Sequence, residues 1–152
     1  RVGLQDAEYM PAPIKFEAGT QRVSQAVAFA AAVRYLQHLG MENVEAWEHE
    51  LGARLVEGVQ KIEGVRLLGP TDPSKRAGLV ALAIEGVHPH DVGQLLDTQG
   101  IAVRVGHHCA QPLHRCAGVT ASTRASTYIY NTTEDVDAFL KALAEVRPYF
   151  GF

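Results

Sequence analysis

The sequence is poor in cysteine and lacks long apolar runs. It has two cysteines, Cys109 and Cys116, in 152 residues. This is too few for a disulfide framework, so we expect a reducing, cytoplasmic environment. No apolar run approaches the length that spans a bilayer, and the first residues do not resemble a signal peptide. We therefore expect no contact with membranes.

An excess of one charge is also lacking. The formal net charge is −3, with acidic and basic residues interspersed, so there is no basic surface of the kind that binds nucleic acid. Hydrophobic residues make up 47% of the chain, which is enough for one core and predicts a single domain. The sequence starts at Arg1 rather than at a methionine, and we expect it to be a fragment of a longer protein.

Apolar residues at three- and four-residue steps predict helices. The first runs from 21 to 39, and alanines on its other face suggest burial on several sides. A second is predicted from the N-cap Asn43 to Glu63. The last begins near Thr132, which is spaced from Asp135 as in a capping box.

Short apolar or alternating runs predict strands between these helices. The apolar run at 79–84 is typical of a strand that is buried on both faces. Short connections between the elements favour an α+β fold, with a small, mostly antiparallel sheet and helices on one face. Strands are predicted over 65–68, 79–84, 101–105 and 122–130, a helix over 89–99, and a loop over 112–121.

The stretch from Arg104 to Pro112 concentrates polar chemistry around Cys109. An arginine, two adjacent histidines and a thiol lie within six positions. Cationic or hydrogen-bonding neighbours lower the pKa of a thiol and make it a better nucleophile. Cys109 is therefore either an exposed nucleophile or a small buried cysteine that only fills space.

Arg124 lies among small residues in a predicted strand, which leaves room for a ligand. The guanidinium fork suits a carboxylate. The alternative is a solvated arginine on an edge strand, and the sequence does not decide between the two. Arg115, in a polar loop, is expected to be solvated.

Histidines and cysteines near the loop raise the question of a metal site. Their spacing matches no usual zinc pattern, and adjacent histidines in an extended chain point to opposite faces. We therefore expect no metal, although a zinc-binding interaction domain stays an alternative. Cys116 could also resolve an oxidised Cys109 as a disulfide, as in a thiol redox module. The residues concerned are His107, His108, Cys109, His114 and Cys116.

Two weaker features lie elsewhere in the chain. His88 and His90 flank Pro89 at a predicted helix start, where surface exposure is the simpler interpretation. Gly19 and Thr20 could form an anion-binding turn, or Thr20 could be an ordinary N-cap.

Three segments together resemble group II cysteine desulfurases of the SufS type. Residues 104–113 (RVGHHCAQPL) resemble the active-site loop of that family, and the histidine pair before the cysteine is specific for group II. Residues 15–20 (KFEAGT) resemble its F-E-A-G-T segment. Residues 123–126 (TRAS), followed by 130–132 (YNT), resemble its C-R-A-S and Y-N-T segment. The three motifs occur in the family's order and cover nearly the whole chain.

The resemblance implies a fold-type I, class V aminotransferase-like enzyme that binds pyridoxal 5'-phosphate and acts as a homodimer. Such an enzyme converts L-cysteine to L-alanine and leaves a persulfide on the protein. Cys109 matches the nucleophile, and Arg124 matches the arginine that holds the substrate carboxylate, with Arg104 and His108 beside it.

The resemblance also implies roles outside the cysteine loop. Thr20, with Gly19, matches the segment that reaches the cofactor phosphate of the other subunit. His90 occupies a position where some relatives use a histidine to take over a zinc ligand of the sulfur-acceptor partner, a protein of the SufE or SufU type.

One family feature is missing, the lysine that forms the Schiff base with the cofactor. That lysine follows a histidine in the family, and none of the lysines here does. The chain is therefore expected to be the C-terminal third of a desulfurase and inactive alone, with the cofactor bound mainly by the missing N-terminal region. Residues 1–39 would be the end of the large domain with its connecting helix, and 40–152 the small domain. The lysines are Lys15, Lys61, Lys75 and Lys141.

Other functions stay open beside desulfuration for iron–sulfur cluster assembly. The same loop would suit a selenocysteine lyase. A free-standing thiol sulfur carrier or redox module would use Cys109 without a cofactor.

Overall fold

The computed structural model describes residues 2–152. The chain divides into two compact units, one ending at Met41 and the other running from Glu42 to Phe152, and each is described here by itself. Whether the first unit belongs to a large cofactor-binding domain stays a prediction.

The first unit is dominated by the predicted long helix, α1 (Val23–Leu39), which follows a short 3-10 helix, η1 (Ile14–Phe16). The prediction that α1 is buried on several sides is wrong, since none of its residues is buried and Phe29 is 73% exposed. Within residues 2–41 there is no other long helix against which α1 could pack.

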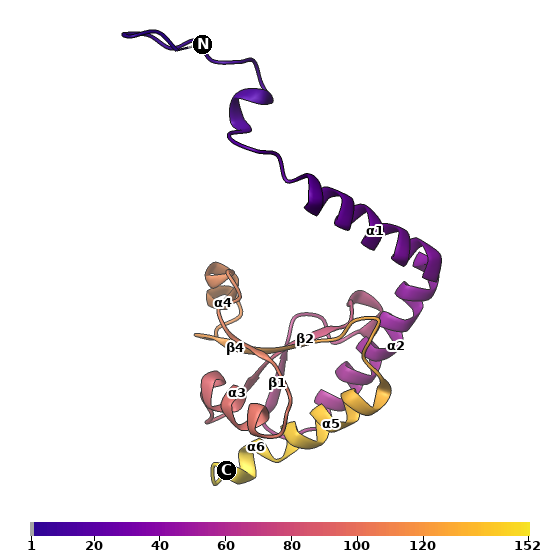
Figure 1. The fold of residues 1–152 in the computed structure, drawn as a ribbon. Coiled ribbons are helices and arrows are strands. Elements are labelled where there is room, and N and C mark those ends of the chain that lie inside the picture. The colour runs from indigo at the N-terminus through magenta and orange to yellow at the C-terminus, as the bar shows by residue number, and fades with distance from the viewer. Residues whose placement is uncertain (1) are drawn as a thin grey trace. The chain divides into compact units, whose positions relative to one another are not determined.

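The second unit is built on a four-stranded sheet with the order β1-β2-β4-β3 (Figure 1). All neighbouring strands are antiparallel, as the sequence predicted. The strands are β1 (Val65–Leu68), β2 (Leu79–Ile84), β3 (Arg104–Gly106) and β4 (Ser122–Ser126).

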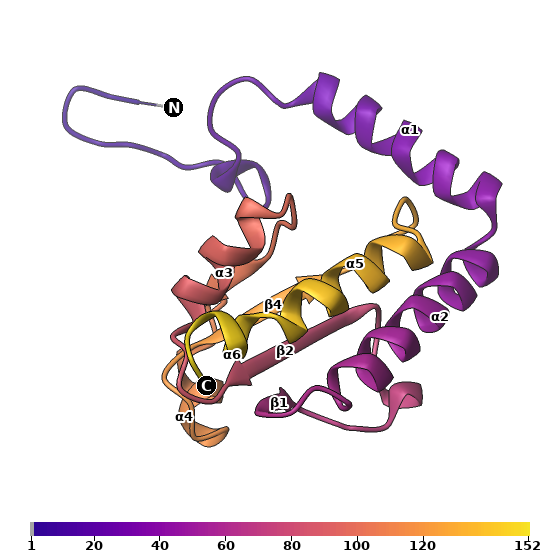
Figure 2. The same ribbon diagram turned by 90° about the horizontal axis from the view of Figure 1, so that it is seen from below.

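Three helices of this unit lie against one face of the sheet, and the other face has only a short helix beside it (Figures 1 and 2). The α+β class with helices on one face is therefore confirmed. The three are α2 (Met41–Val59), α3 (Pro89–Thr98) and α5 (Thr133–Ala144); η2 (Pro73–Lys75), α4 (Gln111–Cys116) and α6 (Val146–Tyr149) are shorter.

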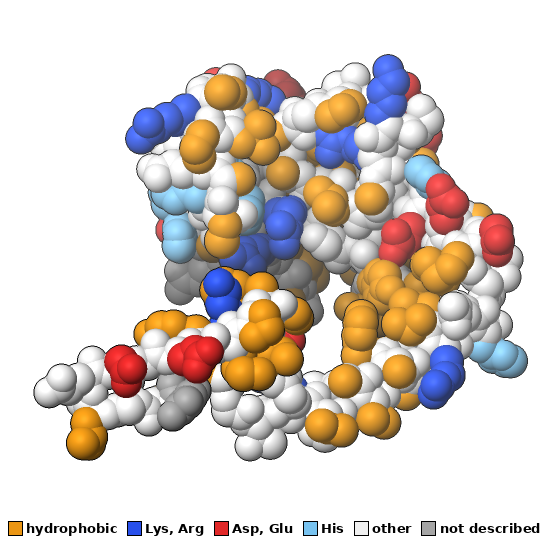
Figure 3. All heavy atoms as spheres, turned by 90° about the horizontal axis from the view of Figure 1, so that it is seen from above, with side chains coloured by type: hydrophobic (Ala, Val, Ile, Leu, Met, Phe, Trp, Pro, Cys, Tyr) orange, Lys and Arg blue, Asp and Glu red, His pale blue; other side chains and the backbone are white. Residues whose placement is uncertain are grey.

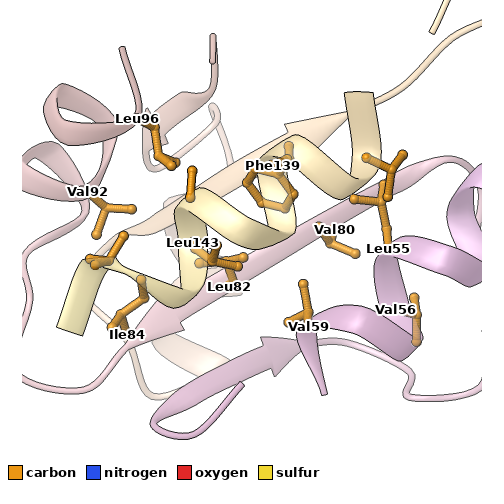
Figure 4. Packing of buried hydrophobic residues seen from close by; sticks show 14 of the residues in the cluster. Leu55, Val56, Val59, Val80, Leu82, Ile84, Val92, Leu96, Phe139 and Leu143 are labelled. Carbon is orange, nitrogen blue, oxygen red and sulfur yellow. The ribbon is translucent and has the colours of Figure 1, made fainter. Parts of the chain in front are cut away.

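The core forms where these helices meet the inward side of the strands (Figure 4). Val80 and Leu82 of β2 are fully buried, whereas Leu79 is 39% exposed. The prediction that β2 is buried on both faces is therefore wrong. Because helices cover only one face, burial alternates along the strand. The helices contribute Leu55, Val59, Leu96, Phe139 and Leu143 among others.

Two helix ends differ in how well the sequence predicted them. Thr132 caps α5 and forms the predicted capping box with Asp135. By contrast, α2 begins at Met41 directly after Gly40, so Asn43 lies inside the helix and is not its N-cap. The positive φ of Gly40, 87°, allows the chain to turn there without an intervening loop.

Boundaries near the cysteine loop also differ from prediction. The predicted loop 112–121 contains the helix α4, with Pro112 in its first turn. β3 starts only at Arg104, because the preceding chain stays attached to α3 through the Ile101 N–H, which donates to the Leu96 carbonyl. β4 ends at Ser126 rather than at 130.

Candidate active site

The face of the sheet away from α2, α3 and α5 carries two arginines that pair across neighbouring strands. Arg104 of β3 pairs across the ladder with Arg124 of β4, so both side chains start from the same face. No salt bridge within residues 2–152 joins either arginine to a carboxylate. The Nε of Arg124 is buried and has no partner among the described residues. Like charges placed this way repel, so the pair suits an anion such as a carboxylate.

β4 lies between β2 and β3, so Arg124 is on an inner strand. The interpretation of Arg124 as a solvated residue of an edge strand is therefore wrong. Arg115 is exposed in α4, as expected. Figure 3 shows the side of the sheet away from α2, α3 and α5, where histidine side chains gather next to arginine or lysine side chains.

The loop that leaves β3 presents Cys109 to solvent. Gly106 has a φ of 112°, and His108 and Cys109 also have positive φ, 52° and 61°. Two consecutive non-glycine residues in this region are uncommon and tend to occur at functional sites. The Ala110 N–H donates to the His107 carbonyl over 2.8 Å and closes the turn. Cys109 is exposed and free, so the alternative of a buried space-filling cysteine is wrong.

A hydrogen-bonded chain of side chains holds this loop to the sheet and to α4. The Nε2 of His108 and the Nε2 of His114 each lie 2.9 Å from the hydroxyl oxygen of Ser122, at the start of β4. The Nδ1 of His114 lies 3.0 Å from the carbonyl of Ala110. His114 and Ser122 are buried. The segment around Cys109 is thereby tied to two secondary-structure elements.

His108 is partly buried and lies near positively charged side chains, and both effects favour its neutral form. Burial is the main cause that lowers its pKa, and the nearby Arg124, His114 and Arg104 lower it further. The hydrogen bond with the Ser122 backbone acts in the opposite direction and does not outweigh them. His108 is therefore a neutral imidazole at physiological pH, able to accept or donate a hydrogen bond.

The sequence did not reveal the parts played by His114 and Ser122. His114 entered only as a possible metal ligand, because the segment around it was interpreted as a loop. The signal that could have identified it is Pro112 at a helix start: with a helix there, His114 lies four residues after Ala110, one turn away.

The histidines and cysteines of the loop do not assemble into a metal site. Within residues 2–152 no group of three or more His, Cys, Asp or Glu side chains could hold an ion. Both ring nitrogens of His114 are already engaged by Ser122 and Ala110. Cys116 is free and exposed at the end of α4. The structure therefore offers no support for the zinc alternative.

His88 and His90 lie apart from the cysteine loop, at the N-terminus of α3. Both are exposed, and their rings stack with centroids 5.4 Å apart. The His88 ring accepts from the His90 N–H and caps the helix. α3 packs on the helix-covered side of the sheet, since the Thr123 hydroxyl of β4 donates to the Pro89 carbonyl over 3.5 Å.

Gly19 and Thr20 belong to the first unit. Both are exposed, and Gly19 has a φ of 82°. The interpretation of Thr20 as the N-cap of α1 is wrong, because the N-cap position is Arg22 and no side chain caps the helix. The Thr20 hydroxyl is therefore not used by α1.

The described residues fit the substrate side of a pyridoxal-phosphate site but not its lysine. The unpartnered Nε of Arg124 suits the carboxylate of an amino acid. Lys61 follows the end of α2 and Lys141 lies in α5, and these two helices cover the opposite face of the sheet. Lys15 lies 5.0 Å from the ring centre of Phe16, and Lys75 lies 3.8 Å from Asp72. That the Schiff-base lysine lies outside this chain stays a prediction.

Comparison with protein families agrees with the fold. Residues 1–139 match the model of the family described as aminotransferase class-V. The chain belongs to the class-V aminotransferase family. A curated relative from Mycobacterium leprae, named probable cysteine desulfurase 2, is 49% identical over 150 residues. A probable cysteine desulfurase of Halalkalibacterium halodurans is 48% identical.

Solved structures of class-V aminotransferases share the fold. The apo cysteine desulfurase of Thermococcus onnurineus aligns over 96% of the chain with a TM-score of 0.84 and 39% identity. The cysteine desulfurase CsdA of Escherichia coli aligns over 98% with a TM-score of 0.85 and 34% identity. Each of the two curated matches includes 99% of this chain, but this chain spans only 36% of the relative's length. It likewise spans 36% of each of the two solved chains. No helix within residues 2–152 is both long and apolar enough to cross a bilayer.

Proposed function

We propose that this chain is the C-terminal segment of a pyridoxal-phosphate-dependent cysteine desulfurase of group II, the SufS type. The observation that carries the proposal is the exposed thiol of Cys109 on a left-handed turn that follows β3. β3 begins with Arg104, the cross-strand neighbour of Arg124. An enzyme that acts on L-cysteine needs a nucleophile close to groups that bind a carboxylate. Here Cys109 follows β3, and the two arginines lie on β3 and on its neighbour β4.

The arginines bind and orient the substrate in this proposal. Arg124 and Arg104 take the carboxylate of L-cysteine, and neutral His108 accepts or donates a hydrogen bond beside them. When bound, pyridoxal phosphate supplies the electron sink for cleavage at the substrate carbon. The Cys109 thiolate attacks the substrate sulfur. A sulfur–sulfur bond forms, the carbon–sulfur bond breaks with its electron pair moving toward carbon, and protonation there yields L-alanine.

The rest of the site would come from the first unit and from residues outside the chain. Residues 1–39 would be the end of the large domain and its connecting helix, and 40–152 the small domain. Thr20 and Gly19, both exposed, would contact the cofactor phosphate across a homodimer. The Schiff-base lysine and most cofactor contacts would lie in the N-terminal region.

The persulfide on Cys109 would then pass to a sulfur acceptor of the SufE or SufU type, for iron–sulfur cluster assembly in the cytoplasm. Two properties support a role for His90 in meeting that acceptor. It is exposed, and it lies in the first turn of α3, where its backbone N–H donates to the His88 ring and its own ring stacks on that ring.

Sulfur transfer by the full-length protein tests the proposal. The enzyme is supplied with L-cysteine, alanine is quantified, and the Cys109 peptide is analysed by mass spectrometry for one added sulfur. We expect both alanine and the persulfide in the unmodified enzyme. Cys109→Ser should lose the persulfide and reduce alanine formation with a physiological acceptor to the background level.

Cys116→Ser is the matched control, because Cys116 is also free and exposed but lies at the end of α4. It should retain full activity. If Cys109→Ser kept wild-type turnover with the acceptor, or if added sulfur appeared on Cys116 instead, the assignment of the nucleophile would be wrong. The same assay with L-selenocysteine distinguishes a desulfurase from a selenocysteine lyase.

A further inference from the structure

The hydrogen bonds behind the cysteine loop determine where the proton of His108 lies. The chain of contacts runs from the Ala110 carbonyl to His114, from His114 to the hydroxyl of Ser122, and from Ser122 to His108. His114 and Ser122 are 6% and 0% exposed, so water does not compete freely for these bonds.

A carbonyl oxygen only accepts, so the Nδ1 of His114, which faces the Ala110 carbonyl, must carry a proton. In neutral His114 the Nε2 is then bare and accepts from the Ser122 hydroxyl. That hydroxyl has a single proton. Its remaining contact, with the Nε2 of His108, therefore requires His108 to donate from Nε2.

We propose that His114 and Ser122 are positioning residues that hold His108 in the Nε2–H tautomer and so keep its Nδ1 free as a hydrogen-bond acceptor for an amino-acid substrate. The proposal rests on the function proposed above. Its independent support is that Nδ1 of His108 is buried and has no hydrogen-bond partner among the described residues.

The position of this bare nitrogen gives it a role toward the substrate. Arg104 and Arg124 act electrostatically on His108, so the ring lies in the field of the pair that suits a carboxylate. An amino acid that presents its carboxylate to the arginines also carries N–H and S–H donors, and a buried acceptor without a partner favours such a donor. The opposite tautomer would place an N–H there and repel it.

The groups around His108 leave one competing arrangement. Those that act on the ring are Arg104, Arg124 and His114, and the His107 ring packs edge-on against His114, 5.8 Å between centroids. If His114 were doubly protonated, its Nε2 would donate to Ser122, and Ser122 would donate to His108. His108 would then carry its proton on Nδ1, so the two arrangements predict opposite tautomers.

The ring nitrogens of His108 can be observed directly. The full 152-residue chain is labelled with ¹⁵N in its histidine rings, and the tautomers are measured by long-range proton–nitrogen NMR at pH 7.5, with His108→Gln used for assignment. We expect His108 to be protonated on Nε2 in the wild type. Ser122→Ala should give a mixture of tautomers, and Ser122→Thr, which keeps the hydroxyl, should restore the single form.

Ser122 is fully buried, so the added methyl group of Ser122→Thr could prevent folding. His114→Gln is a second conservative variant. It should keep the single tautomer of His108, since its amide can donate to the Ala110 carbonyl and accept from Ser122. Circular dichroism confirms that each variant folds. A wild-type His108 protonated on Nδ1, or a tautomer that is the same in Ser122→Ala as in the wild type, overturns the proposal.

Turnover of L-cysteine by the full-length enzyme separates this inference from the proposed function. Ser122→Ala is expected to lower kcat about two- to tenfold with little change in KM. The conservative variants Ser122→Thr and His114→Gln should each show most of the wild-type kcat. If the wild-type enzyme did not release alanine, the proposed function would be wrong. The NMR measurement would still decide the tautomer of His108 independently. An unchanged kcat in Ser122→Ala would overturn the positioning role.

Discussion

Arg124 lies in an electrostatic environment that its own sequence neighbours do not determine. Its cross-strand partner is another arginine, Arg104, and its Nε is buried without a hydrogen-bond partner in residues 2–152. Both features disfavour the unliganded state, because an unpaired buried donor and a facing like charge are each costly. Binding of a carboxylate removes both costs. At the scale of single residues this is the strongest argument for an amino-acid substrate.

Replacement of Arg124 should therefore weaken substrate binding. In the full-length enzyme, Arg124→Ala removes charge-assisted hydrogen bonds that contribute about 1.5–3 kcal/mol. The KM for L-cysteine should rise about 10- to 100-fold. Steady-state kinetics with alanine as the measured product check this.

The control for Arg124 is Arg115→Ala, since Arg115 is exposed on α4. Its KM should equal that of the wild type. A normal KM in Arg124→Ala would remove the carboxylate role from this residue.

At the scale of elements, α5 shows how a local sequence signal specifies a helix start. The Thr132 hydroxyl accepts from the Asp135 N–H over 3.3 Å, and the Asp135 carboxylate accepts from the Thr132 N–H over 3.0 Å. The helix beyond this box contributes Val136 and Phe139 to the core. The cap therefore fixes where that apolar stripe begins.

Removal of the cap should destabilise the chain by about 1 kcal/mol. Thr132→Ala leaves the Asp135 N–H without its acceptor, and for a chain of this size the melting temperature should fall by about 2–4 °C. Thermal and urea denaturation of the 152-residue chain measure the change.

Thr133→Ala is the neighbouring control, because the Thr133 hydroxyl contacts only the exposed Glu134 side chain and does not cap the helix. Its stability should lie within about 0.5 kcal/mol of the wild type. Equal losses from the two variants would show that the box does not stabilise the helix.

At the scale of the whole second unit, one face of the sheet packs against the core and the other face carries residues of the candidate site. α2, α3 and α5 pack on one face (Figure 2), and the arginine pair lies on the other. Because side chains alternate along β4, Thr123 faces the helices while its neighbour Arg124 faces away. The core can therefore hold the strands in place without entering the site.

The two faces should respond differently to substitution along β2. Leu82→Ala removes a fully buried side chain from the core and should cost about 2–5 kcal/mol of the free energy of unfolding. Urea denaturation of the chain, analysed by linear extrapolation, checks the value.

On the same strand, Leu79 is 39% exposed, and Leu79→Ala should cost less than about 1 kcal/mol. Similar losses at the two positions would contradict the one-sided core. A smaller loss at Leu82 than at Leu79 would reverse the assignment of the faces.

Local sequence patterns were sufficient for most elements and for the residues of the cysteine loop. The three- and four-residue apolar spacing predicted α1, α2 and α5, since amphipathic periodicity follows from helix geometry. Pro89, suited to a first helical turn, predicted α3. The polar stretch around Cys109 and the isolated Arg124 were identified because few other residues in those segments carry reactive groups.

Tertiary structure decided what these patterns could not. Pairing of Arg124 with Arg104 depends on the register of two strands that lie twenty residues apart in the chain. The one-sided burial of β2 depends on how many helical layers the sheet receives. The bonds from Ser122 to His108 and His114 depend on α4 folding back over the start of β4. Each of these is a long-range contact, and local periodicity carries no information about long-range contacts.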